Sequence, residues 1–412
     1  MPAEVAVTGI GLVTPAGHTP QENWDALCRG RSLARSDPEL AGLPVDFSCA
    51  VTGFDAAAEL GRPLARRVDR FIQFALVAAR RAVTDAGLGP GPLGERVGVV
   101  LGVGSNCLST YVTEFGHLGA GRPERVSPLA LPRSVPSMAA GEVAVDLGAQ
   151  GPNFTTASAC ASGATALGVA RDLLRSGTCD VVLAGGSESG RSRMAVTCFS
   201  RMRALSRRRD APELASRPFD ARRDGLVLGE GAAVLVLERT ADARARRARV
   251  LALLRGYGAG SDAHHPVAPH PRGEGAARAI RAALRDADCA PRDIAHVNAH
   301  GTSTPLSDAA EAAALTRVFG SHAPAVTASK GVVGHALGAA GAIQAAYTVL
   351  ALRRGLVPPV ANFEGQDGDH KVDIVAGRPR PAAGGAAVSC SFGFGGQNAV
   401  LVFSTVEQGG EG

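Results

Sequence analysis

One cysteine, Cys160, stands where a run of residues typical of a strand gives way to a run typical of a helix. Small and β-branched residues precede it in GPNFTTAS, and after it Ala164, Leu167 and Leu174 recur at helical spacing. A thiol at a helix N-terminus faces free N–H groups and the positive end of the helix dipole, which favour the thiolate. The thiolate is the nucleophile, so this position suits a covalent cysteine catalyst, with a buried structural cysteine as the alternative.

Three loops farther along the chain carry reactive groups among small residues, each after a strand-like run. Their sequences are NAHGTSTP, SKGVVGH and FGFGGQN, with His300 in the first, Lys330 and His335 in the second, and Phe394 in the third. In an α/β sheet such loops gather at one end, where ligands bind. A lone histidine is more often structural, but two histidines and a lysine beside a candidate nucleophile indicate a reactive site.

A cysteine with two histidines suits acyl transfer followed by the formation of an enolate. The thiolate attacks an acyl thioester, and the acyl group moves to sulfur. Two neutral imidazoles can donate N–H groups to the enolate, while backbone N–H groups of Cys160 and of the Phe394 loop stabilise the tetrahedral oxyanion. Lys330 is expected to pair with Glu311 or Asp308, which lie three residues apart on one helix face.

The composition is that of an ordinary globular protein with a sizeable core. Of the 412 residues, 45% are hydrophobic and 20% are charged. The net charge is +5, but there is no long basic run with interleaved aromatic residues, so we expect no nucleic-acid binding. No stretch reaches about 18 uncharged apolar residues and the N-terminus lacks a signal-peptide pattern, so we expect no membrane span and a cytoplasmic location. The eight cysteines are scattered without a CxxC pair, so we expect reduced thiols and no metal site.

Strand-like and helix-like segments alternate along the chain, which predicts an α/β fold in which helices cover parallel strands. The pattern starts again after residue 245, so we expect two similar halves, an N-terminal half over residues 1–248 and a C-terminal half over residues 249–412. The expected strands are 5–12, 96–102, 179–186, 231–238, 250–256, 294–298, 325–328, 386–392 and 399–403. The expected helices are 21–29, 60–88, 275–287, 308–319 and 338–353, besides the one that follows Cys160.

Segments around these reactive groups resemble the β-ketoacyl-acyl carrier protein synthases, the condensing enzymes of the thiolase superfamily. They are TASACASGATALG, VNAHGTSTPLSDAAE, SKGVVGHALGAAGA and SFGFGGQNAVLVF, and the opening VAVTGIGLVTPAG and residues 203–238 match as well. The resemblance spans nearly the whole chain, in order and at the family's spacing. It implies the five-layered αβαβα thiolase fold, usually dimeric, in a free-standing synthase and not a module of a larger one.

The resemblance implies a role for each reactive residue. Cys160 corresponds to the acylated nucleophile, and His300 and His335 correspond to the histidines that promote decarboxylation of a malonyl extender and hold its enolate. Lys330 corresponds to the lysine of the second histidine motif, and Glu311 to its acidic partner.

Other residues are implied to form the walls of the site. Phe394 corresponds to the gating aromatic residue, with Phe392 and Gly395 in the same loop, and its backbone N–H joins that of Cys160 in the oxyanion hole. The loop around residues 261–265 corresponds to a second gating segment. The acyl pocket is expected to include Ser105, Ala130 and Phe199; the small residues at the first two positions would lengthen the pocket or make it more polar, unless neighbours repack around them.

Four arginines, Arg66, Arg67, Arg70 and Arg203, fall near regions that in this family meet the acidic carrier protein. The alternative for the first three is a solvated helix face. The carrier protein brings the phosphopantetheine arm, so we expect no cofactor held by the chain itself.

The sequence therefore predicts a decarboxylative Claisen condensing enzyme that acts on carrier-bound acyl chains, with type II polyketide synthesis favoured over fatty-acid elongation. Two alternatives share the fold: a chain-length-controlling partner in a heterodimer, which usually lacks the nucleophile, and an acyltransferase that does not decarboxylate. A degradative thiolase would need a second catalytic cysteine, but Cys390 lies in the strand before the Phe394 loop. An initiating synthase would carry Asn in place of His335. We expect a dimer, either with a second copy or with a related chain.

Overall fold

The computed structural model describes residues 3–105, 108–382 and 384–406. Its main sheet has ten strands in the order β10-β9-β13-β14-β8-β1-β7-β6-β4-β5. The strands are β1 (Val5–Val13), β4 (Val97–Gly102), β5 (Asn153–Thr156), β6 (Val181–Ser189), β7 (Glu230–Arg239), β8 (Ala252–Ser261), β9 (Ile294–Asn298), β10 (Ala325–Thr327), β13 (Ala386–Gly393) and β14 (Gln397–Ser404). Two small two-stranded sheets pair β2 (Arg35–Ser36) with β3 (Phe47–Ser48) and β11 (Leu356–Val357) with β12 (Arg380–Pro381).

The order of strands repeats between the two halves of the sheet. In the first half β5, β4 and β6 are parallel neighbours, and β7 and β1 follow antiparallel. In the second half β10, β9 and β13 are parallel neighbours, and β14 and β8 follow antiparallel. The halves join where Val5–Val7 of β1 pairs with Ala252–Leu254 of β8. This repeat confirms two similar halves, while the division between residues 248 and 249 stays a prediction.

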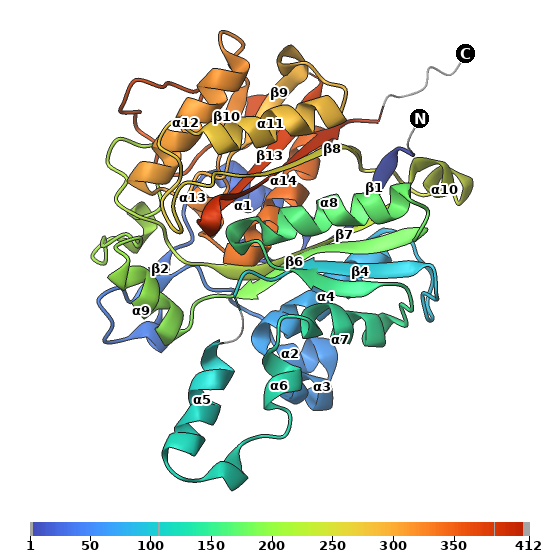
Figure 1. Cartoon of the computed structure of the whole chain (residues 1–412). Helices are drawn as coiled ribbons and strands as arrows, with labels where there is room; N and C mark the ends of the chain where they lie inside the picture. Colours follow the sequence, from blue (N-terminus) through green and yellow to red (C-terminus); the bar gives the residue numbers. More distant parts are fainter. Residues whose placement is uncertain (1–2, 106–107, 383, 407–412) are drawn as a thin grey trace.

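Helices form three layers around the two halves of the sheet (Figure 1). The middle layer holds α8 (Ser162–Arg175) and α14 (Ala340–Arg354), which pack on each other and contact strands of both halves. One outer layer holds α4 (Arg70–Asp85) and α7 (Met138–Leu147), and the other holds α11 (Glu274–Asp286) and α12 (Pro305–Phe319). The order of layers is therefore αβαβα, as expected.

The two middle helices carry small residues where they meet, because they lie very close together. A Cβ atom on Gly163 would lie 2.7 Å from the backbone nitrogen of Ala342, and one on Gly341 would lie 2.7 Å from that of Ala164. Every residue of α14 from Ala340 to Ala351 is buried, as expected for a helix enclosed on all sides. This close contact explains the Ala- and Gly-rich sequences after Cys160 and His335.

The prediction of a single helix over residues 60–88 is wrong. The segment forms α2 (Ala56–Leu60), α3 (Arg62–Arg67) and α4. Gly61, with φ of 80°, ends the first helix, and the chain is extended at Val68 before the third. The apolar face predicted for the last of these helices is confirmed, since Phe71, Ala75, Leu76, Ala79 and Val83 are all buried.

The other expected strands and helices agree with the structure to within a few residues at each end. The remaining α-helices are α1 (Pro20–Arg29), α5 (Leu108–Gly119), α6 (Ala130–Ser134), α9 (Arg193–Arg201), α10 (Thr240–Ala245) and α13 (Lys330–Val333). No helix among the described residues is long and apolar enough to span a membrane. The described cysteines are free thiols; Cys107 lies outside the described residues.

Candidate active site

The three parallel strands of the second half bring the reactive loops together. β9 ends at Asn298, β10 at Thr327 and β13 at Gly393, so the loops that follow them all start at one edge of the sheet. Cys160 reaches the same place from the first half, after β5. These loops enclose a cavity of about 320 Å³, whose lining includes Cys160, His300, His335, Phe199, Phe392 and Phe394.

Cys160 lies in a short 3-10 turn, Ala159–Ala161, between β5 and α8. Ala159 adopts a left-handed backbone conformation with φ of 49°, which is costly for a residue with a side chain and marks a tightly constrained turn. Ser162 secures the turn, because its hydroxyl donates to the carbonyl of Ala159 (2.6 Å) and accepts from the N–H of Ser158 (2.9 Å). The junction of strand and helix predicted at Cys160 is thus confirmed.

The thiol of Cys160 is buried and lies close to two backbone donors. Cys160 is only 7% exposed, and this burial raises the pKa of its thiol to about 11. The charge of Lys330 and the backbone N–H groups of Phe394 and Cys160 lower the pKa by smaller amounts. The backbone N–H groups favour the thiolate, as expected, but desolvation of the buried thiol has the larger effect on its pKa. The same two N–H groups are those expected to form the oxyanion hole, and that role stays a prediction.

His335 is held so that its Nε2–H group can donate a hydrogen bond. Its Nδ1 accepts the backbone N–H of Leu337 at 3.2 Å, so the neutral ring carries its hydrogen on Nε2. The backbone of His335 pairs with that of Val227 and Gly229, at 2.8 and 2.9 Å. Burial, followed by the charge of Lys330, holds the pKa of His335 well below its ordinary value. His335 is therefore a neutral hydrogen-bond donor at the cavity.

His300 is fixed in the same way by a different partner. The ammonium group of Lys330 lies 3.3 Å from its Nδ1, so Nδ1 accepts and Nε2 carries the hydrogen. Burial, followed by the charge of Lys330 and the neighbouring His335, holds the pKa of His300 well below its ordinary value. The rings of His300 and His335 meet edge to face with 5.5 Å between their centroids. The cavity therefore contains two neutral imidazoles that each offer an Nε2–H group.

Lys330 is expected to pair with Glu311 or Asp308, but its partners in the structure are different. Among the described residues Lys330 forms no ion pair; it donates to the carbonyl of His300 at 2.6 Å and to Oε1 of Gln344. Glu311 instead accepts the backbone N–H groups of His300 (2.7 Å) and Gly301 (2.8 Å). Burial raises the pKa of Glu311 and lowers that of Lys330. Glu311 thus supports the His300 loop directly and influences Lys330 only through its charge.

Sequence analysis missed two buried polar residues beside the site. Gln344 of α14 accepts from Lys330 and donates to the carbonyls of Ala299 (2.9 Å) and Cys390 (3.1 Å), so it ties Lys330 to β9 and β13. Glu188 of β6 binds the turn after His335. Their only signal in the sequence is a polar residue within an apolar run, GAIQAAY for the first and LAGGSES for the second.

The two gating loops contact each other at one side of the cavity. Gly395, with φ of 74°, donates its N–H to the carbonyl of Pro266 at 2.7 Å, and Asp262 donates its N–H to that of Gly396 at 2.9 Å. The ring of Phe394 lies 6.0 Å from that of Phe199. The ring of Phe392 lies 5.9 Å from that of His300. Phe199, Phe392 and Phe394 thus form an aromatic wall, and the assignment of the two loops as gates stays a prediction.

Ser105 and Ala130 are not among the residues that line this cavity, and their place in an acyl pocket stays a prediction. The hydroxyl of Ser105 donates to Glu188 at 2.9 Å. Ala130 is buried at the start of α6. The chain between β4 and α7 runs away from the cavity and forms α5 and α6, which project from the body of the protein (Figure 1).

The four predicted docking arginines lie in different surroundings. Arg203 is exposed at the mouth of the cavity, and Arg66 is exposed on α3. Arg67 is paired with Glu142 at 2.6 Å. Arg70 forms an ion pair with the buried Glu230 at 2.8 Å and stacks on Phe74. Within the part of the chain that the structure describes, the side chains of Arg203 and Arg66 form no ion pair, while Arg70 has a structural role.

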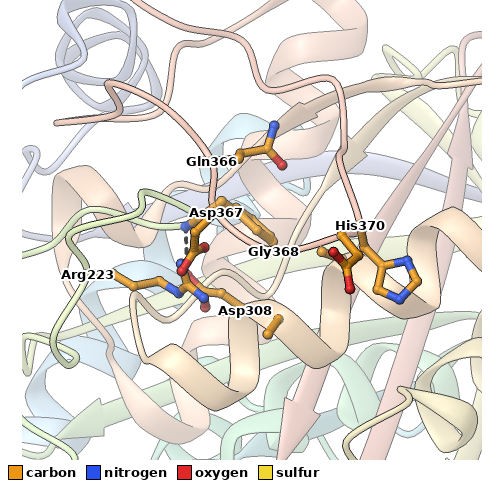
Figure 2. Close-up of a pocket in the computed structure, with 10 residues that line it drawn as sticks. Arg223, Asp308, Gln366, Asp367, Gly368 and His370 are labelled. Carbon is orange, nitrogen blue, oxygen red and sulfur yellow. Dashed lines mark hydrogen bonds and ion pairs between the residues drawn. The ribbon is translucent and has the colours of Figure 1, made fainter.

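A second, smaller cavity of about 120 Å³ lies beside the first half of α12, and Arg223, Asp308 and residues 366–370 are among its lining (Figure 2). Arg223 forms an ion pair with Asp367 on one side of it and donates to the carbonyl of Pro305 at 3.1 Å. Asp308 accepts the N–H groups of Phe219 (2.7 Å) and Ser303 (3.1 Å), and burial raises its pKa to about 6. These contacts hold the turn between His300 and α12, so this region supports the active site.

A buried thiol in one cavity with two neutral imidazoles, on a duplicated αβαβα fold, defines the class of cysteine-dependent condensing enzymes. Comparisons with known proteins identify the family. The profile described as "Beta-ketoacyl synthase, N-terminal domain" matches residues 3–243, and that described as "Beta-ketoacyl synthase, C-terminal domain" matches residues 251–364. The chain belongs to the β-ketoacyl synthase family of the thiolase superfamily, as a ketosynthase of the acyltransferase type.

Curated relatives and solved structures agree with this assignment. The chain is 40% identical to 3-oxoacyl-[acyl-carrier-protein] synthase 2 of Synechocystis sp., covering 97% of both chains. It is also 40% identical to the Staphylococcus aureus protein of the same name, covering 98% of both. The ishigamide ketosynthase/chain length factor superposes with a TM-score of 0.92 at 35% identity, covering 98% of this chain and 100% of the other. AntDE:AntF, described as a type II PKS acyl-carrier protein in complex with its ketosynthase bound to the hexaketide, gives 0.89 at 29% identity, with the same coverage.

Proposed function

We propose that this ketosynthase loads an acyl chain from an acyl carrier protein onto Cys160 and extends it with a malonyl unit by decarboxylative Claisen condensation. The observation that carries the proposal is the pair of neutral imidazoles, His300 and His335, in one cavity with a buried thiol. A neutral imidazole can donate a hydrogen bond to the oxygen of a developing enolate while keeping its own proton, and so stabilise it.

In the loading step the sulfur of Cys160 attacks the thioester carbonyl of the acyl carrier protein. The oxyanion of the tetrahedral intermediate accepts the backbone N–H groups of Cys160 and Phe394. Collapse of the intermediate breaks the bond to the phosphopantetheine sulfur, which leaves with the proton that Cys160 gave up. The chain itself needs no cofactor for this step.

In the extension step a malonyl thioester enters beside the acylated Cys160. The Nε2–H groups of His300 and His335 donate to its thioester oxygen, so that loss of carbon dioxide leaves a stabilised enolate. The enolate carbon attacks the acyl carbonyl, the carbon–carbon bond forms, and the sulfur of Cys160 leaves and takes a proton from solvent. The product is a β-ketoacyl chain on the carrier protein.

We propose type II polyketide synthesis as the pathway. The support is the high structural similarity to the ishigamide ketosynthase and to the ketosynthase of AntDE:AntF. The second candidate is fatty-acid elongation, which is favoured by the 40% identity to 3-oxoacyl-[acyl-carrier-protein] synthase 2 over nearly the whole chain. The pocket residues Ser105 and Ala130 no longer help to choose, because they do not line the cavity.

The acyl carrier protein is the proposed partner, and Arg203 and Arg66 are its proposed contacts. Both side chains are exposed, and neither forms an ion pair within the described residues. An acidic carrier protein would supply the missing charges. The reaction needs Cys160 reduced, which is consistent with the expected cytoplasmic location.

The ketosynthase is proposed to act as a dimer, with a second copy or a related chain. Its surface exposes apolar side chains on α5 and α6, of which Phe115 is 65% exposed and Leu131 63%. β5 is an edge strand of the main sheet and exposes Phe154. Apolar patches and open strand edges of this kind are usually covered by another chain. Phe115→Asp should shift the species measured by light scattering from dimer to monomer; an unchanged dimer would contradict this interface.

Intact-protein mass spectrometry tests the proposed function. The protein is mixed with acyl carrier proteins that carry either saturated acyl chains or poly-β-keto chains, and malonyl carrier protein is then added. We expect an adduct that is absent from Cys160→Ala, followed by a product longer by two carbons. Extension of poly-β-keto chains supports the polyketide pathway, whereas extension of saturated chains alone supports fatty-acid elongation. An adduct that is never extended would overturn the condensing role.

A further inference from the structure

Glu188, a residue of β6, is a buried carboxylate that the steps above do not use. It is 1% exposed, and among the described residues it has no ion pair. Its Oε2 accepts three backbone N–H groups, from Gly104 (2.8 Å), Ser105 (3.0 Å) and Gly338 (3.3 Å). Its Oε1 accepts the hydroxyl of Ser105 at 2.9 Å. Burial raises the pKa of Glu188, and these donors oppose the rise.

The three N–H groups come from two segments that Glu188 joins. Gly104 and Ser105 follow β4, whereas Gly338 belongs to the turn between His335 and α14. The two backbones are nearly in contact, since a Cβ atom on Gly338 would lie 2.0 Å from the nitrogen of Gly104. Removing the shared acceptor would leave buried N–H groups unsatisfied and directed at one another, so the segments would separate.

The turn that Glu188 holds also fixes the ring of His335. Leu337, with a strained φ of 45°, donates its N–H to Nδ1 of His335 at 3.2 Å. Gly338 is the next residue, and its N–H is the one bound by Glu188. The backbone of His335 is anchored separately, by Val227 and Gly229, so the ring relies on this turn for its Nδ1 partner.

We propose that Glu188 is a positioning residue for His335. By anchoring Gly338 it keeps the N–H of Leu337 on Nδ1, and so keeps the hydrogen of the ring on Nε2, where the enolate forms. The catalytic consequence rests on the role proposed above for His335. Loading of Cys160 does not use His335, so loss of Glu188 should slow extension more than loading. The charge of Glu188 also raises the pKa of the Cys160 thiol, and Met and Gln at this position both remove that charge.

The test compares two substitutions of similar size. Glu188→Met removes the acceptor, whereas Glu188→Gln keeps an oxygen for the three N–H groups and an amide that can donate to Ser105. We expect Glu188→Met to lower the rate of extension at least about tenfold with loading within about threefold, as expected for the loss of one charge-assisted contact. Glu188→Gln should restore most of the rate. In a His335→Ala background Glu188→Met should cause no further loss.

A second readout reports on the ring itself. Histidine nitrogen-15 NMR should show a single Nε2–H tautomer for His335 in the unsubstituted protein and a mixture in Glu188→Met, with the signal of His300 unchanged. If Glu188→Met does not fold, Glu188→Asp, which withdraws the acceptor, should show the same change in part. A single tautomer in the Met or Asp variant, or equal losses of loading and extension, would overturn the inference. If His335→Ala extends chains normally, the role of His335 fails, and the NMR signal still tests Glu188.

Discussion

Lys330 holds its ammonium group 3.3 Å from Nδ1 of His300 and 2.6 Å from the carbonyl oxygen of the same residue. The first contact sets the tautomer of the ring, and the second fixes the backbone that carries it. Because the lysine is a cation, it also lowers the pKa of both His300 and His335. Burial is the main cause of the low pKa of both imidazoles, and the charge of Lys330 lowers it further.

Replacing Lys330 with Met should therefore impair extension more than loading. A hydrogen bond to a charged group contributes about 1.5–3 kcal/mol, so we expect a loss of about 10- to 100-fold in the rate of extension. Without the cation the pKa of both histidines should rise, so activity should fall further as the pH is lowered. Lys371→Met, at an exposed lysine that contacts only a backbone carbonyl, is the matched control. Equal pH profiles for Lys330→Met and the unsubstituted protein would contradict this role.

The reactivity of Cys160 in the free protein should rise with pH. Burial raises the pKa of the thiol to about 11, so at neutral pH nearly all of it is protonated. The thiolate fraction then grows about tenfold per pH unit from about pH 7 to pH 10. Mass spectrometry of iodoacetamide labelling, with Cys160→Ala as the background, measures this rate. A plateau already reached at neutral pH would show that the free protein holds a thiolate.

The contact between the middle helices should be sensitive to a single methyl group. Gly163→Ala places a Cβ atom 2.7 Å from the backbone nitrogen of Ala342, and we expect a loss of about 1–3 kcal/mol in the free energy of unfolding. Gly116→Ala is the control, because Gly116 also lies in a helix, α5, and its Cβ atom would meet nothing within 4 Å. The control should gain up to about 1 kcal/mol. Denaturant unfolding measures both values, and equal changes would refute the close-contact argument.

Binding of the carrier protein should depend on the charge at the mouth of the cavity. Arg203→Glu should raise the KM for acyl carrier protein about tenfold at low salt, and the effect should shrink in about 0.5 M salt because salt screens exposed charges. Arg292→Glu reverses the charge of an exposed residue just before β9 begins, at the end of the strand away from the His300 loop. This variant should leave KM unchanged. An equal KM for Arg203→Glu and the unsubstituted protein would assign Arg203 to the solvated surface. Arg66→Glu tests the second proposed contact in the same way.

The sequence was sufficient to predict the parts of the site that depend on chain order and local pattern. His300, Lys330 and Phe394 each follow a strand, and parallel strands bring such loops to one edge, so their meeting with Cys160 could be foreseen. Most strand and helix bounds could be foreseen as well, because hydrophobic periodicity is local. The exception is residues 60–88, where Gly61 and the extended Val68 interrupt a helical pattern.

The remaining features depend on contacts between distant parts of the chain. Lys330 binds Gln344 and His300 instead of Glu311, because the packing of α14 against β9 and β13 places Gln344 beside it. The thiol of Cys160 has a raised pKa because other segments bury it, which no local motif reports. The hydroxyl of Ser105 binds Glu188, a contact that joins residues 83 apart in the chain.

The central claim is that His335 serves extension and not loading, and one variant tests it directly. His335→Ala is loaded from an acyl carrier protein and then given malonyl carrier protein, and both steps are followed by intact-protein mass spectrometry. The account predicts that Cys160 still accepts the acyl chain at a rate within about threefold, whereas extension falls at least about 100-fold, as expected when a donor to a developing oxyanion is removed. Extension at the rate of the unsubstituted protein would contradict the account.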